Sequence, residues 1–255
     1  MREINVDIFH AFSDRPDGGS AAGIIDAGET LSANDMQAVA RIVGIPACGF
    51  ITALDHKAID VRFFSTKTEY PICGHGSVAL LTWLIDNKRI AVDHHKGLDV
   101  DLRTPAGSAA MRAVSQSDGR HRVSLELQPV FFESCNATAS DLARIFSLSE
   151  DEFEGATPIE ITHSDFTHII VRLKSLSAMQ QLTPDFVAID RFCRDHCAQT
   201  LAVFCTDTVE PESTVHMREF CPTVGTPEAP ASGTTNRALG CFIHRHGLFE
   251  PNDTG

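Results

Sequence analysis

The chain has 255 residues, of which 43% are hydrophobic and 22% are charged, a balance typical of a folded globular protein. Its formal net charge is -13, and no run of Lys or Arg interrupts the acidic excess, so nucleic acid is excluded as a partner. No stretch approaches the ~18 apolar residues of a membrane helix, and the N-terminus lacks the apolar core of a signal peptide. We therefore expect no membrane partner and a cytoplasmic location.

The first half of the chain mixes strands and helices. Residues 4–12 and 59–64 alternate apolar and polar side chains, which predicts strands. Residues 32–44 have apolar positions at helical spacing behind Ser32, which predicts a capped helix. Residues 75–87 (HGSVALLTWLIDN) are almost entirely apolar, which predicts a central helix surrounded by protein.

The second half repeats this mixture. Strands are predicted near residues 107–113, 122–128, 168–173, 201–205 and 214–220, and helices near 140–146, 185–196 and 234–245. Thr183-Pro184 is a favourable helix start, with Thr as the cap and Pro at the first helical position. We place a boundary near residue 114, which predicts two domains, 1–114 and 115–255.

Eight cysteines are spread along the chain rather than arranged as a compact disulfide framework, so we expect reduced core residues. Cys193, His196 and Cys197 share one helical segment, but no second ligand pair stands at zinc-site spacing. The sequence therefore predicts no metal site.

The most informative feature is an internal duplication. Glu69–Gly74 (EYPICG) aligns with Glu228–Gly233 (EAPASG). The matches around these segments pair Ala79 with Ala238, Leu80 with Leu239, Arg62 with Arg218 and Phe64 with Phe220. A repeated supersecondary unit is the simplest explanation.

Each copy has the same physical logic. A strand ends, a Glu-x-Pro turn follows, and Cys73 or Ser232 precedes a helix. Unpaired N–H groups at a helix N-terminus bind carboxylates, so two facing copies predict a site for one small carboxylate-bearing molecule. The same helix end favours the thiolate of Cys73, which makes it a candidate base. The alternative is that both segments are merely capped helices with small residues at the turn.

Two segments resemble motifs of the phenazine-biosynthesis-F-like (PhzF-like) proteins of the diaminopimelate epimerase and proline racemase superfamily. They are Phe63–Gly76 (FFSTKTEYPICGHG) and Glu228–Thr235 (EAPASGTT), and Gly19–Ala22 and Arg41–Phe50 stand in the places of two further family segments. The resemblance implies an α+β, diaminopimelate-epimerase-like fold of two similar halves, each a curved sheet around a central helix, with the active site in the cleft between them. It implies no cofactor and allows a homodimer.

The resemblance also implies a chemistry. Racemases of this superfamily use two cysteines on opposite faces of a carbon next to a carboxylate; Cys73 matches the first, and Ser232 replaces the second. We expect a cofactor-independent isomerase that moves a proton next to the carboxylate of a small amino-acid-like substrate. Phenazine-type enzymes carry a glutamate and an aspartate where this chain has Ala47 and Ala229, so that specific activity is not expected.

Two alternatives stay open at this point. One is a dehydratase of the hydroxyproline type that uses the same Cys and Ser pair. The other is a ligand-binding protein that has kept the fold and lost the chemistry. The chain also ends at Gly255, before the family's usual final strand.

Several neighbours of the two central residues are candidate substrate-binding residues. They are Gly74, His75, Gly76, Gly233, Thr234 and Thr235. We expect Glu69 and Glu228 to brace their turns by hydrogen bonds. Further candidates are Cys48 beside the missing glutamate, Ser20 in the early turn, and His168, for which a substrate-facing and a core position are equally open.

Overall fold

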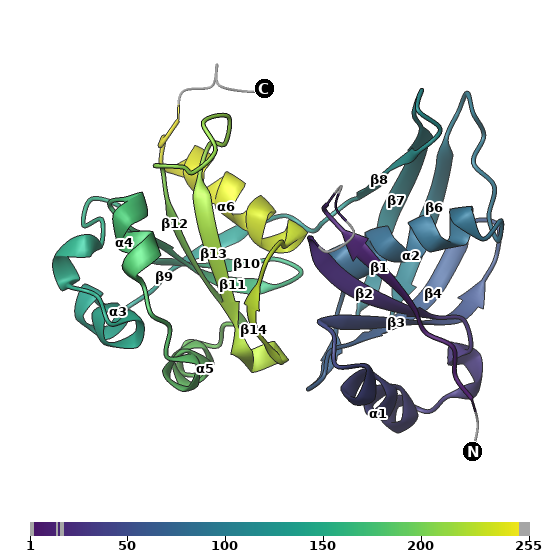
Figure 1. Cartoon of the computed structure of the whole chain (residues 1–255), viewed down its shortest axis with the longest axis horizontal. Helices are drawn as coiled ribbons and strands as arrows, with labels where there is room; N and C mark the ends of the chain where they lie inside the picture. Colours follow the sequence, from purple (N-terminus) through teal and green to yellow (C-terminus); the bar gives the residue numbers. More distant parts are fainter. Residues whose placement is uncertain (1–2, 14, 16–17, 250–255) are drawn as a thin grey trace. The chain divides into compact units, whose positions relative to one another are not determined.

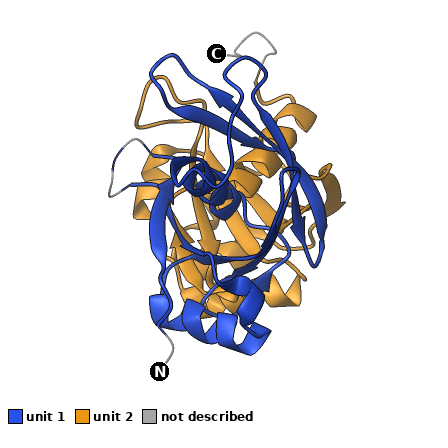
Figure 2. Cartoon of the chain, turned by 90° about the vertical axis from the view of Figure 1, so that its right-hand side faces the viewer, with its two compact units in different colours: residues 1–127 blue, residues 128–255 orange. Residues whose placement is uncertain are grey.

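A computed structural model describes residues 3–13, 15 and 18–249 (Figure 1). The chain divides into two compact units, residues 1–127 and 128–255, which are coloured separately in Figure 2. The boundary expected near residue 114 is wrong, because it falls inside β7 (Gly107–Ser115). β7 pairs antiparallel with β8 (His121–Leu125), and β8 belongs to the first sheet, so the first unit ends after β8.

The sheet of the first unit (unit 1) has seven strands in a continuous path, with a short eighth strand added. Their order is β1 (Asp7–Ala11), β2 (Ser20–Ile25), β3 (Ala47–Leu54), β4 (Ala58–Phe64), β6 (Leu98–Thr104), β7 and β8, and β5 (Glu69–Tyr70) pairs with β4. The β2–β3 and β4–β6 pairs are parallel. The sheet curls around helix α2 (Gly74–Asp86), which contacts both edge strands, β1 and β8 (Figure 2).

Helix α2 is central because its side chains are apolar on every side. Residues buried along it are Gly76, Ser77, Ala79, Leu80, Leu81, Trp83 and Leu84. The indole Nε1 of Trp83 donates a 2.8 Å hydrogen bond to Asp7 on β1, so its polar end is satisfied as well. The predicted central helix is therefore confirmed.

Helix α1 (Ala33–Val43) covers the other face of this sheet. Ser32 caps it in a reciprocal capping box with Asp35, and the helix ends at Gly44, whose φ of 73° is left-handed. Its inner face packs against a cluster that includes Cys48 and Phe50 of β3. The predicted capped helix is confirmed.

The sheet of the second unit (unit 2) has six strands. Their order is β14 (Thr226–Ala229), β13 (His216–Cys221), β12 (Thr200–Cys205), β11 (Thr167–Arg172), β10 (Glu160–His163) and β9 (Phe131–Ser134). One face is covered by α3 (Ala139–Phe146), α4 (Leu176–Gln181) and α5 (Phe186–Asp195), and the opposite face by α6 (Gly233–Arg245) (Figure 1). Ile169 and Val171 of β11 face the first layer, and Ile170 faces α6, as the period of a strand requires.

Two local expectations differ from the structure. Helix α5 begins after Asp185, whose carboxylate accepts from the N–H groups of Val187 and Ala188, so Thr183 is not its cap. Helix α4, with six residues, is too short to leave a clear helical period in the sequence. No helix in the described part of the chain is long and apolar enough to span a membrane.

Candidate active site

The two duplicated turns are held by the same ion pair. Arg62 on β4 donates from Nε and from its terminal nitrogen to the two carboxylate oxygens of Glu69, each at 2.7 Å. Arg218 on β13 makes the equivalent pair of hydrogen bonds to Glu228, at 2.7 and 2.9 Å. Such bidentate pairs fix orientation as well as distance. The bracing role expected for both glutamates is confirmed.

Cys73 stands at the N-cap of α2 with its backbone extended (φ -136°, ψ 105°). Its carbonyl accepts from both the backbone N–H and the hydroxyl of Ser77, at 2.8 and 2.7 Å. The side chain makes no capping hydrogen bond. Its Sγ lies 3.6 Å from Nδ1 of His75, so the structure brings these two predicted site residues together.

Burial sets the protonation of this pair. Cys73 is 4% exposed, and burial raises the pKa of its thiol to about 12, against a smaller opposing effect of the nearby Gly76 backbone N–H. Burial thus acts against the thiolate that the helix end favours. Burial also lowers the pKa of His75 to about 4, although a hydrogen bond to the Ala21 backbone acts in the other direction. Burial therefore favours a neutral thiol beside a neutral imidazole.

Gly76 is required by packing around this cysteine. A Cβ built on it would lie 2.9 Å from the ring of Phe63 and 3.0 Å from Sγ of Cys73. The sequence favours a glycine here for close approach of a ligand, but protein atoms fill that space. Gly74, the first residue of α2, keeps its place among the N–H groups of the helix N-terminus.

Ser20 and Cys48 lie on opposite faces of the unit 1 sheet. Ser20 is buried at the start of β2, next to Ala21, the residue whose backbone bonds His75. Cys48 belongs to the apolar cluster under α1, and burial raises its pKa to about 11. Cys48 is therefore a core residue whose side chain points away from α2. The next residue on the strand, Gly49, faces α2, because a Cβ added there would meet Phe63.

Ser232 occupies the matching position at the N-cap of α6. Its hydroxyl accepts from the Thr235 N–H at 3.4 Å, and it lies 2.9 Å from the Thr235 hydroxyl and 3.3 Å from that of Thr234. Asn236 donates to the Ser232 carbonyl at 2.7 Å. Unlike Cys73, Ser232 caps its helix with its side chain. The residues Gly233, Thr234 and Thr235 thus surround Ser232 as the first turn of α6.

A buried polar network continues from Ser232 into unit 2. The Thr235 hydroxyl donates to Oε1 of Glu219 at 2.5 Å and lies 3.3 Å from Nδ1 of His168. The same Nδ1 lies 2.7 Å from the hydroxyl of Thr200. Thr235 and His168 are fully buried, and Glu219 is 4% exposed. Of the two positions left open for His168, the structure therefore shows the core one.

Burial favours the neutral forms of both ionisable groups in this network. Burial lowers the pKa of His168 to about 3, so its imidazole is neutral near pH 7. Burial raises the pKa of Glu219, against hydrogen bonds from Thr235, Ser232 and Thr200 that act in the other direction. Ser232 is thus linked to a buried carboxyl group whose proton is held more tightly than in water.

Glu219 and Thr200 are absent from the candidates that the sequence suggests. One signal was available: Glu219 lies between Arg218 and Phe220, which match Arg62 and Phe64 in the duplication, but the residue between those two is Phe63. An acid that replaces an aromatic residue on a buried strand position indicates a special environment.

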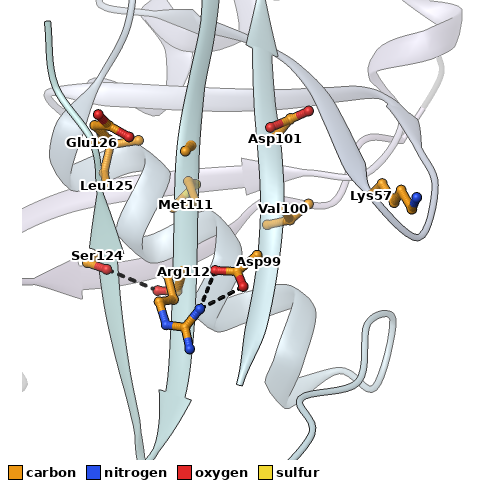
Figure 3. A pocket seen from close by; sticks show the side chains of 10 residues that line it. Lys57, Asp99, Val100, Asp101, Met111, Arg112, Ser124, Leu125 and Glu126 are labelled. Carbon is orange, nitrogen blue, oxygen red and sulfur yellow. Dashed lines mark hydrogen bonds and ion pairs between the residues drawn. The ribbon is translucent and has the colours of Figure 1, made fainter. Parts of the chain in front are cut away.

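The hollow drawn in Figure 3 lies over β6, β7 and β8 of unit 1. It has a volume of about 650 Å³ and is lined by Lys57, Asp99, Val100, Asp101, Ala110, Met111, Arg112, Ser124, Leu125 and Glu126. Arg112 pairs with Asp99 at 2.6 Å, and both side chains are largely exposed. None of the predicted site residues lines it, so we do not assign it a part in the chemistry.

Comparison with known proteins gives the family. Residues 9–254 match the family model described as phenazine biosynthesis-like protein. The chain belongs to this family. The match spans both duplicated turns, and the resemblance inferred from the motifs is confirmed.

Individual relatives support the assignment to this family. A protein of Bacillus subtilis named uncharacterized isomerase YfhB is 28% identical over 251 residues, with 98% of this chain and 84% of the relative covered. The trans-2,3-dihydro-3-hydroxyanthranilate isomerase of Pseudomonas chlororaphis is 26% identical, with 95% and 81% covered. The solved structure of a Bacillus anthracis phenazine biosynthesis protein of the PhzF family superposes with a TM-score of 0.84 at 22% identity, with 95% and 80% covered. The expected α+β fold class is confirmed.

Proposed function

We propose that this PhzF-like protein is a cofactor-independent isomerase that moves a proton on the carbon next to the carboxylate of a small amino-acid-like molecule. The observation that carries the proposal is the pair of N-cap positions, with Cys73 before α2 and Ser232 before α6, each behind a bidentate Arg–Glu brace. A cap alone does not require that the whole turn be duplicated. The isomerase names of the relatives support the reaction class.

Substrate binding follows from the helix ends. The first N–H groups of α2 and α6 have no partner within their helices, and the helix dipole places partial positive charge there. Gly74, Gly233 and Thr234 supply such N–H groups. A carboxylate bound at these groups also gains stabilisation as its neighbouring carbon loses a proton and the charge spreads onto the carboxylate oxygens.

Proton removal begins at Cys73. Because the pKa of its thiol is raised to about 12, Cys73 must lose its proton to a neighbour before it acts as a base. His75 lies 3.6 Å from Sγ and is the neighbour that takes this proton; because burial disfavours both the thiolate and the imidazolium, the negative charge of the bound carboxylate must stabilise the imidazolium. The thiolate then takes the proton from the substrate carbon, and the Ser232 hydroxyl supplies one.

The test is proton NMR in deuterated water with a panel of amino acids, hydroxyprolines and cyclic carboxylic acids. We expect the wild-type protein to replace the α-proton of at least one compound by deuterium, and Cys73→Ala to abolish this exchange. Cys48→Ala is the matched control, because it removes another fully buried thiol of the same unit from the opposite face of the sheet. We expect it to retain exchange.

The other outcomes decide among the alternatives. Exchange that persists in Cys73→Ala would rule out Cys73 as the base. Loss of water from a hydroxyproline would identify the dehydratase, and binding of a compound without any exchange would identify the non-catalytic binder.

A further inference from the structure

The two units repeat the same strand pairing in the sheets that pack against α2 and α6. In unit 1, Cys48 of β3 pairs with Phe64 of β4; in unit 2, Leu201 of β12 pairs with Phe220 of β13. The duplicated arginines lie over these rings, Arg62 at 5.3 Å from the centre of Phe64 and Arg218 at 5.1 Å from that of Phe220. Equivalent positions can therefore be assigned residue by residue.

Four equivalent positions, beneath α2 in unit 1 and beneath α6 in unit 2, carry different kinds of side chain in the two units. The parallel pair Ala22 and Ala47 in unit 1 corresponds to His168 and Thr200 in unit 2, and the pair Phe63 and Gly76 corresponds to Glu219 and Thr235. In unit 1 these four side chains are apolar or absent, and Phe63 fills the space over Gly76. In unit 2 all four positions carry hydrogen-bonding side chains joined in one network.

This network is a costly way to fill a core. Burying a carboxyl group and an imidazole costs free energy unless every polar atom finds a partner. Among the described residues, Oε2 of Glu219 and Nε2 of His168 are buried and have no hydrogen-bond partner. Unit 1 shows that apolar residues fill the equivalent space, so packing alone does not explain the acid in unit 2.

We propose that Glu219 is a positioning acid for Ser232, holding the proton that Ser232 exchanges with the substrate and passing it through the hydroxyl of Thr235. This inference rests on the proposed function and gives its serine the partner that a hydroxyl needs to act as an acid or base. Glu219 does not itself reach the substrate in this scheme.

The proton transfers balance in both directions. When Ser232 protonates the substrate carbon, its hydroxyl proton leaves, the Thr235 proton moves to Ser232, and the Glu219 carboxyl proton moves to Thr235. Glu219 ends as a carboxylate. When Ser232 accepts a proton from the substrate, the same three transfers run in reverse, and Glu219 ends as a neutral acid. The contacts of 2.9 Å between Ser232 and Thr235 and 2.5 Å between Thr235 and Glu219 are hydrogen-bond distances. The Glu219 carboxylate accepts from Thr235, whereas the neutral acid donates to Thr235, which then donates to Ser232.

The ionisable groups that face Glu219 come from two strands. His168 approaches from β11 through the hydroxyls of Thr235 and Thr200. Cys221 stands two residues further along β13, and its pKa is raised, chiefly by burial and in part by Glu219. A neutral imidazole and a neutral thiol leave Glu219 without a buried cation, and this favours its protonated form.

The first test measures Glu219 itself and needs no substrate. Protein labelled with carbon-13 at glutamate carboxyl groups is titrated by NMR, and the resonance missing from Glu219→Gln is assigned to Glu219. We expect its midpoint above the ordinary value of 4.5. Thr235→Val and Ser232→Ala each remove a hydrogen bond that favours the carboxylate, so each is expected to raise the midpoint further.

Thr82→Val is the matched control. It removes a partly buried hydroxyl from α2 in unit 1, where this hydroxyl donates to the Val78 carbonyl at 2.8 Å. It is expected to leave the Glu219 midpoint unchanged. A titration midpoint of Glu219 at or below 4.5, or a midpoint that does not change in Ser232→Ala, would overturn the inference. Melting curves of all variants show whether each is folded before it is titrated.

The second test uses any compound whose α-proton the wild-type protein exchanges. Glu219→Gln keeps the shape and still accepts from Thr235 but holds no exchangeable acid proton. We expect kcat for deuterium incorporation to fall at least ~10-fold with KM little changed, and the pH dependence due to this acid to disappear. Glu219→Asp is expected to recover part of the rate. An unchanged kcat in Glu219→Gln would count against the relay.

The two failures are distinguishable. If the wild-type protein exchanges no compound but the Glu219 midpoint is raised and responds to Ser232→Ala, the proposed function fails while the coupling stands. If Cys73-dependent exchange occurs and Glu219 shows no such response, the proposed function stands and the role of Glu219 is rejected.

Discussion

The guanidinium of Arg62 donates two hydrogen bonds of 2.7 Å to the carboxylate of Glu69 and so ties strand β4 to the turn that leads into Cys73. Both side chains are about one-third exposed or less, at 27% and 31%. The pair is therefore only partly screened by water, and its geometry restrains both the strand end and the helix start.

A double-mutant cycle on this pair measures its contribution. We expect Arg62→Ala and Glu69→Ala to show a coupling of about 1 kcal/mol in the free energy of unfolding, the upper end of the range for such pairs. The control is Arg112 with Asp99, whose side chains are 48% and 72% exposed. Their coupling is expected to be only a few tenths of a kcal/mol. Equal coupling in the two cycles would contradict the bracing role. Urea unfolding supplies the measurement.

Alanine at two helical glycines is predicted to act in opposite directions. Gly76→Ala places a Cβ 2.9 Å from the ring of fully buried Phe63, so overpacking of about 1–3 kcal/mol exceeds the gain of up to ~1 kcal/mol in helix propensity. Gly240→Ala on α6 meets nothing within 4 Å, so it is expected to stabilise the protein by ~0.5–1 kcal/mol. Thermal or urea unfolding of the two variants tests the signs. Stabilisation by Gly76→Ala would show that Phe63 moves aside.

The stability of the protein is predicted to fall in mild acid because of His168. Burial lowers its pKa from 6.5 to about 3, so below pH 6.5 the unfolded chain binds a proton that the folded chain does not. The contribution of this histidine is fully present above pH 6.5, and on the order of 3 kcal/mol of it is lost by pH 4. His168→Gln is expected to flatten this slope, whereas a Gln at the exposed His56 leaves it unchanged. Urea unfolding at several pH values gives the slopes, and identical slopes in all three proteins would exclude His168 as the cause.

Thiol modification is predicted to separate the exposed from the buried cysteines. Cys197 is exposed, whereas burial raises the pKa of Cys73 to about 12. Because only the thiolate reacts, iodoacetamide at pH 8 is expected to alkylate Cys197 at least ~100-fold faster than Cys73. Peptide mapping by mass spectrometry follows both sites, and Cys197→Ser should remove the fast phase. Rapid alkylation of Cys73 in the unliganded protein would show that its thiolate forms without a change in its surroundings.

Local patterns were enough for much of the fold and for the centre of the candidate site. The duplication of Glu69–Gly74 in Glu228–Gly233 identified both helix N-termini, because a turn and a cap are encoded by consecutive residues. The apolar run of residues 75–87 likewise predicted a buried helix from side-chain chemistry alone. The family motifs added the fold class, which the comparisons confirm.

Long-range pairing decided the rest. The domain boundary lies after β8 because that strand pairs with β7, and no local signal near residue 114 encodes this pairing. The pKa of Cys73 depends on burial by residues distant in sequence, and this burial opposes the effect of the helix N-terminus that the sequence shows. Thr235 contacts both Glu219 and His168 only because the registers of β11, β12 and β13 bring these two residues under α6. The sequence by itself determined the two turns and the candidate residues that follow them, whereas only tertiary structure decided which ionisable groups are buried beside them, since burial and strand register are properties of the whole folded chain.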